Sequence, residues 1–187
     1  MDLSLGTLSQ IMKLDQSYEL HLARLLILMN EMSKKPYGEV IQGLTKLVKL
    51  DFLLRYPTVL EKALERKGKS TKAAGIKEHE IDSVESKMIR YKFGPWDKRY
   101  WEFLRILEAK GLILFGEEDK TVLIRLTKKG KKTSESLIKL KEFEDFQKRS
   151  KIITRVFGKN KATYLMKLMY GLRPELYQMK FGEAIEA

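Results

Sequence analysis

The stretch from Met88 to Thr127 constrains the fold of this chain more than any other part of its sequence. It begins with a β-prone run, residues 88–93, which a Gly-Pro pair ends. A helix is expected next, because Asp97 can cap its first turn, apolar residues recur at helical spacing, and Gly111 suits a helix exit. Two more β-prone runs follow, separated by the polar residues 116–120, which is the pattern of a hairpin. We therefore predict the order strand, helix, strand, turn, strand.

Two helical patterns precede this stretch and complete the order of a winged helix-turn-helix. Residues 40–55 carry apolar positions at helical spacing, and Pro57 suits the first position of a second helix, residues 58–66. The sequence therefore predicts an α+β fold with a winged-helix core. In that core we expect residues 88–93 to pair with the last strand of the hairpin, residues 122–126.

The predicted winged-helix domain covers residues 39–132 and lies between two helical segments. Residues 1–38 form the first segment, with an amphipathic helix at 18–32, and residues 133–187 form the second. Within the domain, residues 67–83 are rich in Lys, Gly, Ser and Glu and predict a mobile insertion. This insertion is either a loop that tolerates length or a basic arm that orders on a partner.

The second helical segment should begin with a long helix, from Lys128 to Ser150, capped by Thr127. A break at Gly158 then precedes a helix at 162–170. Apolar stripes on the first and last helices either pack internally or dock onto another subunit. We expect docking by three residues of the last helix: Leu165, Leu168 and Met169.

A strongly basic composition favours a polyanionic partner. The chain has 187 residues, with 37 Lys and Arg against 25 Asp and Glu, and a net charge of +12. Neutralising phosphates releases counterions, so such an excess favours nucleic-acid binding, although acidic protein partners and solubility also explain basic surfaces. The candidate DNA-binding residues lie on the last predicted helix of the winged helix, on its wing and just after it: Lys98, Arg99, Arg105, Lys120, Arg125, Lys128, Lys129, Lys131 and Lys132.

The sequence also excludes several classes of protein. Cysteine is absent, which excludes disulfides and thiolate chemistry. The strongest apolar run, residues 20–32, is too short and too polar to span a bilayer, and no signal-peptide pattern is present. We therefore expect a cytoplasmic protein.

Catalytic motifs are not found. Around Gly158 a P-loop would need glycine where Ile153 stands and Ser or Thr where Asn160 stands. His79 lies between two glutamates, but this cluster is more typical of a solvated surface than of a metal site. The residues 108–110, Glu-Ala-Lys, have the letters of a nuclease unit but fall at a helix end, where a strand's alternation is unavailable. We therefore expect a non-catalytic protein that binds no metal ion and no cofactor.

Two segments resemble a known family. Residues 49–57 and 88–100 are similar to the middle component of bacterial ABC-three-component systems, including the LmuC-like subunit of Lamassu-type anti-phage defence. The resemblance covers about residues 40–140. It implies a non-catalytic winged-helix adaptor that joins an SMC-like coiled-coil ATPase to an effector, often a nuclease. An alternative interpretation of the same residues is a free-standing winged-helix transcription regulator that dimerises through its terminal helices.

Overall fold

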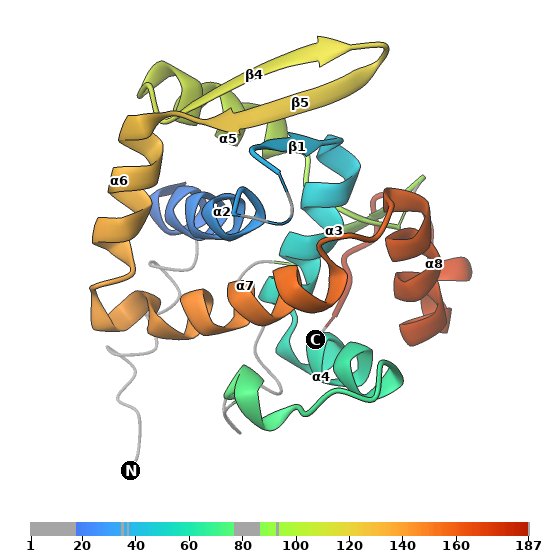
Figure 1. Ribbon diagram of the computed structural model, residues 1–187. Helices are drawn as coiled ribbons and strands as arrows, with labels where there is room; N and C mark the ends of the chain where they lie inside the picture. The colour runs from blue at the N-terminus through green and yellow to red at the C-terminus, as the bar shows by residue number, and fades with distance from the viewer. Residues whose placement is uncertain (1–17, 35, 37, 77–86, 93, 187) are drawn as a thin grey trace, which may run out of the picture.

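The computed structural model describes residues 18–34, 36, 38–76, 87–92 and 94–186, which form a mixed α+β structure (Figure 1). The helices are α2 (Tyr18–Met32), α3 (Leu44–Arg55), α4 (Pro57–Arg66), α5 (Tyr100–Ala109), α6 (Lys128–Leu137), α7 (Glu144–Phe157) and α8 (Ala162–Leu172). The strands are β1 (Val40–Gln42), β2 (Ile89–Tyr91), β3 (Gly94–Trp96), β4 (Ile113–Glu118) and β5 (Thr121–Leu126). Three short 3-10 turns complete the list: η1 (Lys72–Ala74), η3 (Lys141–Phe143) and η4 (Pro174–Tyr177).

One antiparallel sheet has the strand order β1-β5-β4. The β4–β5 hairpin runs along the top of the molecule in Figure 1 and projects beyond the helices. Asp119 and Lys120 close the hairpin with φ angles of 47° and 62°. Positive φ at both central residues is the geometry of a type I′ turn, which matches the twist of the two strands.

The strand that joins this hairpin is β1, and the expectation for residues 88–93 is corrected. Ile89 pairs with Trp96 in a separate two-stranded sheet, whereas Val40 pairs with Arg125 of β5. The expected helix at 40–55 accordingly starts later, at Leu44. Gly43 makes this possible, because its φ of 92° turns the chain sharply between β1 and α3.

The small β2–β3 sheet is extended by the C-terminal segment. Backbone hydrogen bonds join Arg90 N to Glu183 O and Ile185 N to Met88 O, each at 2.8 Å. The buried Tyr56 hydroxyl fixes this junction, since it donates to Ile185 O at 2.9 Å and accepts from Met88 N at 2.8 Å. Residues from three distant parts of the sequence therefore meet at one phenol.

Helix α2 lies at the centre of the helical layer. Every residue from His21 to Met32 is buried, because α6 and α7 pack against this helix together with α3 and α5. The buried apolar residues form one cluster, to which α2, α3, α4, α5, α7 and α8 all contribute. Leu137 of α6 is partly buried against this cluster. The N-terminal and C-terminal helical segments thus share a core with the middle of the chain.

The single long helix expected at 128–150 is wrong. Helix α6 ends at Leu137, and Leu140 has an extended conformation with ψ of 133° before η3 and α7 begin. In Figure 1, α6 and α7 run in clearly different directions and bracket α2. A continuous helix could not cover α2 in this way.

A buried ion pair ties three helices together. Arg24 of α2 donates to both carboxylate oxygens of Asp51 of α3, at 2.8 and 3.2 Å, and the Tyr100 hydroxyl of α5 donates to Asp51 at 2.5 Å. Burial alone would raise the pKa of Asp51, but the Arg24 guanidinium outweighs burial and holds this pKa below its usual range. The carboxylate therefore stays charged in the core.

Several local signals are confirmed. Helix α2 spans Tyr18–Met32 as expected, and Pro57 is the first residue of α4. Gly111 has φ of 68° after α5, and the Thr127 hydroxyl accepts a hydrogen bond from Gly130 N at 2.9 Å at the start of α6. Within the described ranges, no helix combines the length and the apolar character needed to cross a membrane.

The first part of the expected insertion is packed against α7. Ala74 is buried, and Arg149 donates to the carbonyl oxygens of Ala74 and Gly75 at 3.0 and 3.2 Å. The cluster around His79, which was expected to be a solvated surface, lies outside the described residues, as does the rest of the insertion up to residue 83.

Candidate nucleic-acid interface

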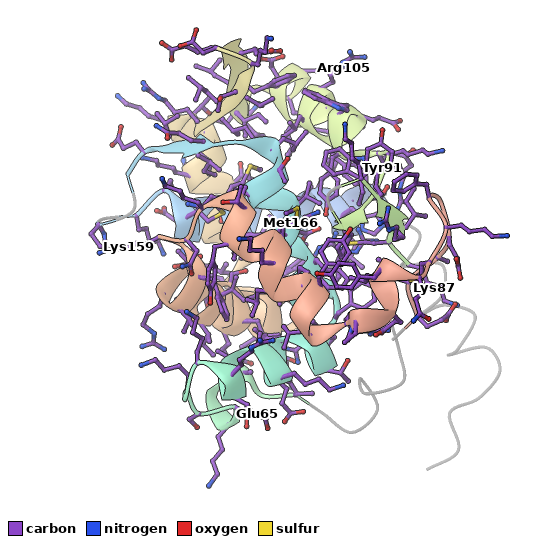
Figure 2. All side chains as sticks on the ribbon, turned by 90° about the vertical axis from the view of Figure 1, so that its right-hand side faces the viewer. Glu65, Lys87, Tyr91, Arg105, Lys159 and Met166 are labelled. Carbon is purple, nitrogen blue, oxygen red and sulfur yellow. The ribbon has the colours of Figure 1, made fainter. Side chains whose placement is uncertain are left out.

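The structure places the basic residues predicted for this helix in different environments: Arg105 lies on α5, whereas Lys98 and Arg99 lie in the turn just before it. Lys98 and Arg105 are exposed, and Arg105 lies at the outer surface near the top of Figure 2. Arg99 instead forms an ion pair with Asp97, with Nη2–Oδ2 at 2.7 Å and Nε–Oδ1 at 3.0 Å. The hydrogen bond to Asp97 raises the pKa of Arg99, so this side chain is committed to the protein itself.

Asp97 serves this part of the fold as an ion-pair partner as well as a turn residue. Its Oδ1 accepts a hydrogen bond from the Arg99 amide nitrogen at 3.0 Å. Its Oδ2 forms a second ion pair with Nη1 of Arg55 of α3, at 3.1 Å. Burial alone would raise the pKa of Asp97, but the hydrogen bonds from Arg99 and the charge of Arg55 lower it to about 2. The prediction that Asp97 caps the helix is wrong: α5 begins at Tyr100 with Arg99 at its N-cap position and no side-chain cap, and Asp97 stabilises the turn before it.

The exposed face of α5 and the hairpin tip carry mixed charge. Arg105 is flanked on α5 by the exposed residues Glu102 and Glu108, and Lys120 follows three acidic residues, 117–119, at the tip. Arg125 is exposed on β5, further from the tip. Phosphates approaching this face would meet carboxylates as well as cations, so attraction there is weak.

Four predicted lysines lie together at the start of α6. Lys128, Lys129 and Lys132 are exposed, and Lys131 is half-buried with its Nζ 3.9 Å from Glu39. Lys129 Nζ donates to the Lys110 carbonyl at 2.8 Å. The first turn of α6 contains no acidic residue, although the helix dipole favours negative charge there. The positive charge of these lysines therefore opposes the preference of a helix N-terminus for negative charge.

A basic groove beside the turn end of the hairpin was not predicted. It has a volume of about 690 Å³ and lies between β5, the start of α3, the start of α5 and the α7–α8 turn. Its charged lining residues are all lysines and its aromatic residues are both tryptophans of the chain: Lys46, Lys120, Lys159, Lys161, Trp96 and Trp101. The sequence signal was the Lys-Asn-Lys turn at 159–161, which only the tertiary fold brings next to Lys120 and Trp101.

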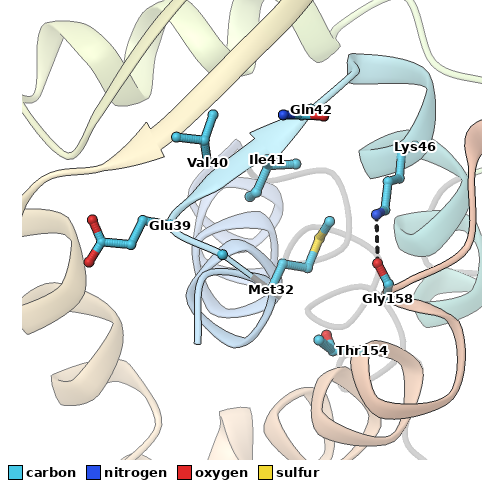
Figure 3. A pocket seen from close by; sticks show the side chains of 9 residues that line it. Met32, Glu39, Val40, Ile41, Gln42, Lys46, Thr154 and Gly158 are labelled. Carbon is cyan, nitrogen blue, oxygen red and sulfur yellow. Dashed lines mark hydrogen bonds between the residues drawn. The ribbon is translucent and has the colours of Figure 1, made fainter. Parts of the chain in front are cut away.

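Lys46 has a structural role at the edge of this groove. Its Nζ donates to the Gly158 carbonyl at 2.6 Å and so holds the α7–α8 turn against α3 (Figure 3). Burial lowers the pKa of Lys46. Behind it lies a second pocket of about 320 Å³, under β1 and lined by Met32 and Thr154.

The expected partner-binding residues of α8 are in the core, which corrects their assignment. Leu165 and Met169 are fully buried and Leu168 is 6% exposed. The apolar stripe of α8 faces α3 and α4, so internal packing accounts for it. Tyr164 of the same helix is exposed, as are the aromatic residues Tyr91, Tyr177 and Phe181.

One candidate catalytic group, Glu108, lies within the described residues. Glu108 is exposed at the end of α5, where its Oε1 accepts a hydrogen bond from Phe115 N at 3.3 Å. Among the residues that the structure describes, no group of three or more His, Cys, Asp or Glu side chains could hold a metal ion. Comparison of the chain with protein-family models, curated proteins and solved structures finds no match.

Proposed function

We propose that this chain is a non-catalytic winged-helix adaptor that joins an SMC-like coiled-coil ATPase to an effector in an anti-phage defence complex, and that it contacts DNA. The order α2-β1-α3-α5-β4-β5, with the sheet order β1-β5-β4, carries this proposal. In a winged helix, α3 and α5 are the helix-turn-helix pair and β4–β5 is the wing. Helix α4, the insertion and the β2–β3 hairpin then separate the two helices of that pair.

The packing of the two family-like segments supports the adaptor part of the proposal. Segments 49–57 and 88–100 lie against each other, since Lys49 Nζ donates to the Pro95 carbonyl at 2.6 Å and Arg55 pairs with Asp97. Residues 49–55 belong to α3, so the β2–β3 sheet is fixed to one helix of the proposed helix-turn-helix pair. A winged helix alone does not need this sheet, whereas an adaptor needs surfaces beyond its DNA-contacting face.

The lysines of α6 support the DNA part of the proposal. Four cations within five residues, without acidic neighbours in the first turn, form the densest charge next to the wing. Contacts of this kind bind phosphates without reading sequence. They give an adaptor affinity for any DNA that the ATPase engages.

Reversal of the charges on α6 tests the DNA contact. A variant with Lys128, Lys129, Lys131 and Lys132 changed to Glu should bind duplex DNA more weakly. Its plot of log affinity against log salt should also be flatter, by about one unit of slope for each lost phosphate contact. Fluorescence anisotropy between about 50 and 200 mM salt measures both effects.

The matched control reverses four exposed lysines elsewhere: Lys62, Lys69, Lys72 and Lys151. The control has the same net charge, so it separates local contacts from the overall field. An α6 variant whose salt slope equals that of the wild type would remove these lysines from the DNA interface.

Co-expression tests the adaptor function and separates it from the transcription-regulator alternative. The adaptor should co-purify stoichiometrically with a coiled-coil ATPase encoded beside its gene. The regulator would need free apolar faces on its terminal helices, but Leu25 of α2 and Leu165 of α8 are fully buried. A stable dimer that binds a palindromic operator alone, measured by light scattering and anisotropy, would contradict the adaptor proposal.

A further inference from the structure

We propose that the groove beside the turn end of the wing binds single-stranded nucleic acid, with a base stacked on Trp101 and the backbone held by Lys120, Lys159 and Lys161. The inference rests on the nucleic-acid contact proposed above and specifies which form of nucleic acid this face selects. Four features of the groove lead to it.

The first feature is charge of one sign. Lys120 comes from the hairpin, Lys159 and Lys161 come from the α7–α8 turn, and no residue lining the groove is acidic. These three lysines form no ion pair with any described residue, whereas Lys46 is held by Gly158. Three unpaired ammonium groups around one groove are suited to successive phosphates of a strand.

The second feature is exposed aromatic surface. Trp101 is 41% exposed, and its ring is supported from one side by Phe115 at a centroid distance of 6.5 Å. Trp96 lines the same groove, and its ring centroid lies 6.0 Å from that of Tyr91. The Tyr91 side chain is 47% exposed. Bases can stack on such rings whatever their sequence.

The third feature is the backbone of the groove wall. Helices α3 and α8 both begin in the groove, at Leu44 and Ala162, and neither has a side-chain cap. The first N–H groups of a helix have no intrahelical acceptor and carry partial positive charge. They add to the attraction that the lysines exert on phosphate oxygens.

The fourth feature is what surrounds the groove, and it favours a single strand over a duplex. Glu102 and Glu108 are exposed on α5, outside the groove lining, and would lie near the phosphates of a duplex that covered this wider surface. In a duplex, bases stack on each other and present only their edges. A tryptophan in a groove of about 690 Å³ can stack only on an unpaired base.

The experiment uses the full chain and the fact that both tryptophans line the groove. Short oligothymidine should quench the intrinsic fluorescence of the wild type, and a hairpin duplex should do so only at much higher concentration. With labelled oligothymidine and anisotropy, Trp101→Ala should bind about 5- to 150-fold more weakly, and Trp101→Phe should retain most of the affinity.

A charge-reversal pair completes the test. Lys159→Glu with Lys161→Glu should weaken binding and lower the salt slope by about 1.4, at about 0.7 per phosphate contact of a single strand. The matched control, Lys69→Glu with Lys72→Glu, should bind as the wild type does. All substituted side chains in these variants are exposed, and circular dichroism checks that each variant is folded.

Three results would overturn the inference: groove variants with wild-type affinity, equal affinity for duplex and single strand, or quenching by a nucleoside triphosphate as strong as by the oligonucleotide. The α6 lysine variant distinguishes the two proposals. If it loses all binding while the groove variants lose none, DNA contact stands and the groove is excluded. If the wild type binds no nucleic acid, both fail, and co-purification with the ATPase still decides the adaptor function.

Discussion

Replacing Asp51 with Ala should destabilise the folded protein by about 3–5 kcal/mol. Asp51 and Arg24 are both fully buried, with Nε–Oδ1 at 2.8 Å. Removing the carboxylate leaves the Arg24 guanidinium without its charge partner in the core, and breaking a buried pair in this way costs about that much. The Tyr100 hydroxyl loses its acceptor in the same substitution.

A surface ion pair provides the matched control. Lys148 and Glu144 of α7 are 2.5 Å apart, but their side chains are 51% and 53% exposed. Glu144→Ala should therefore cost less than about 1 kcal/mol, because water screens exposed pairs. The two substitutions remove carboxylates at similar distances from their cations, so burial is the variable that is tested.

Urea unfolding followed by circular dichroism measures both free energies of unfolding. A third variant, Arg24→Met with Asp51→Leu, removes both charges and keeps the volume filled, and it should recover most of the stability. If Asp51→Ala lowers the free energy of unfolding no more than Glu144→Ala does, burial does not set the cost of breaking the ion pair. The same conclusion follows if the double variant is as unstable as Asp51→Ala.

Two further predictions concern the core and a close backbone approach. Burial lowers the pKa of Lys49 from 10.5 to about 7. At pH values between these two pKa values, the Lys49 side chain is protonated in the unfolded chain and neutral in the folded chain. The free energy of unfolding should therefore rise with pH there, by up to about 1.4 kcal/mol per pH unit, and urea unfolding of Lys49→Met at several pH values should show a flatter dependence. A Cβ on Gly130 would lie 1.9 Å from the Leu112 carbonyl oxygen, so Gly130→Ala should cost about 1–3 kcal/mol in thermal or urea unfolding. Gly116→Ala, whose Cβ would meet no atom within 4 Å, is the control and should leave stability nearly unchanged.

The parts of the fold that could be predicted depend on neighbouring residues. The bounds of α2, the first residue of α4, the left-handed Gly111 and the Thr127 cap each follow from side-chain chemistry within a few positions. Strand pairing does not. The run at 88–93 and the three residues of β1 have similar β-prone character, and the choice of β1 as the partner of β5 depends on tertiary packing.

The candidate site divides in the same way. A charge pattern identified the lysines of α6, which lie within five residues of one another. It could not show that Arg99 is neutralised by Asp97, or that Leu165 is covered, because both depend on packing. The groove is formed by residues from several separate elements and could not be inferred from spacing alone.

The hydroxyl of Tyr56 sets a condition on how the protein is made in the cell. It donates a hydrogen bond to the Ile185 carbonyl, 129 residues further along the sequence. Helix α2 likewise becomes buried only when α7, much later in the sequence, packs against it. During synthesis these early segments leave the ribosome long before their partners exist. Contacts over such separations form slowly, and the apolar side chains awaiting them favour aggregation. We therefore expect the nascent chain to depend on chaperones, and slow expression at low temperature to raise the yield of folded protein.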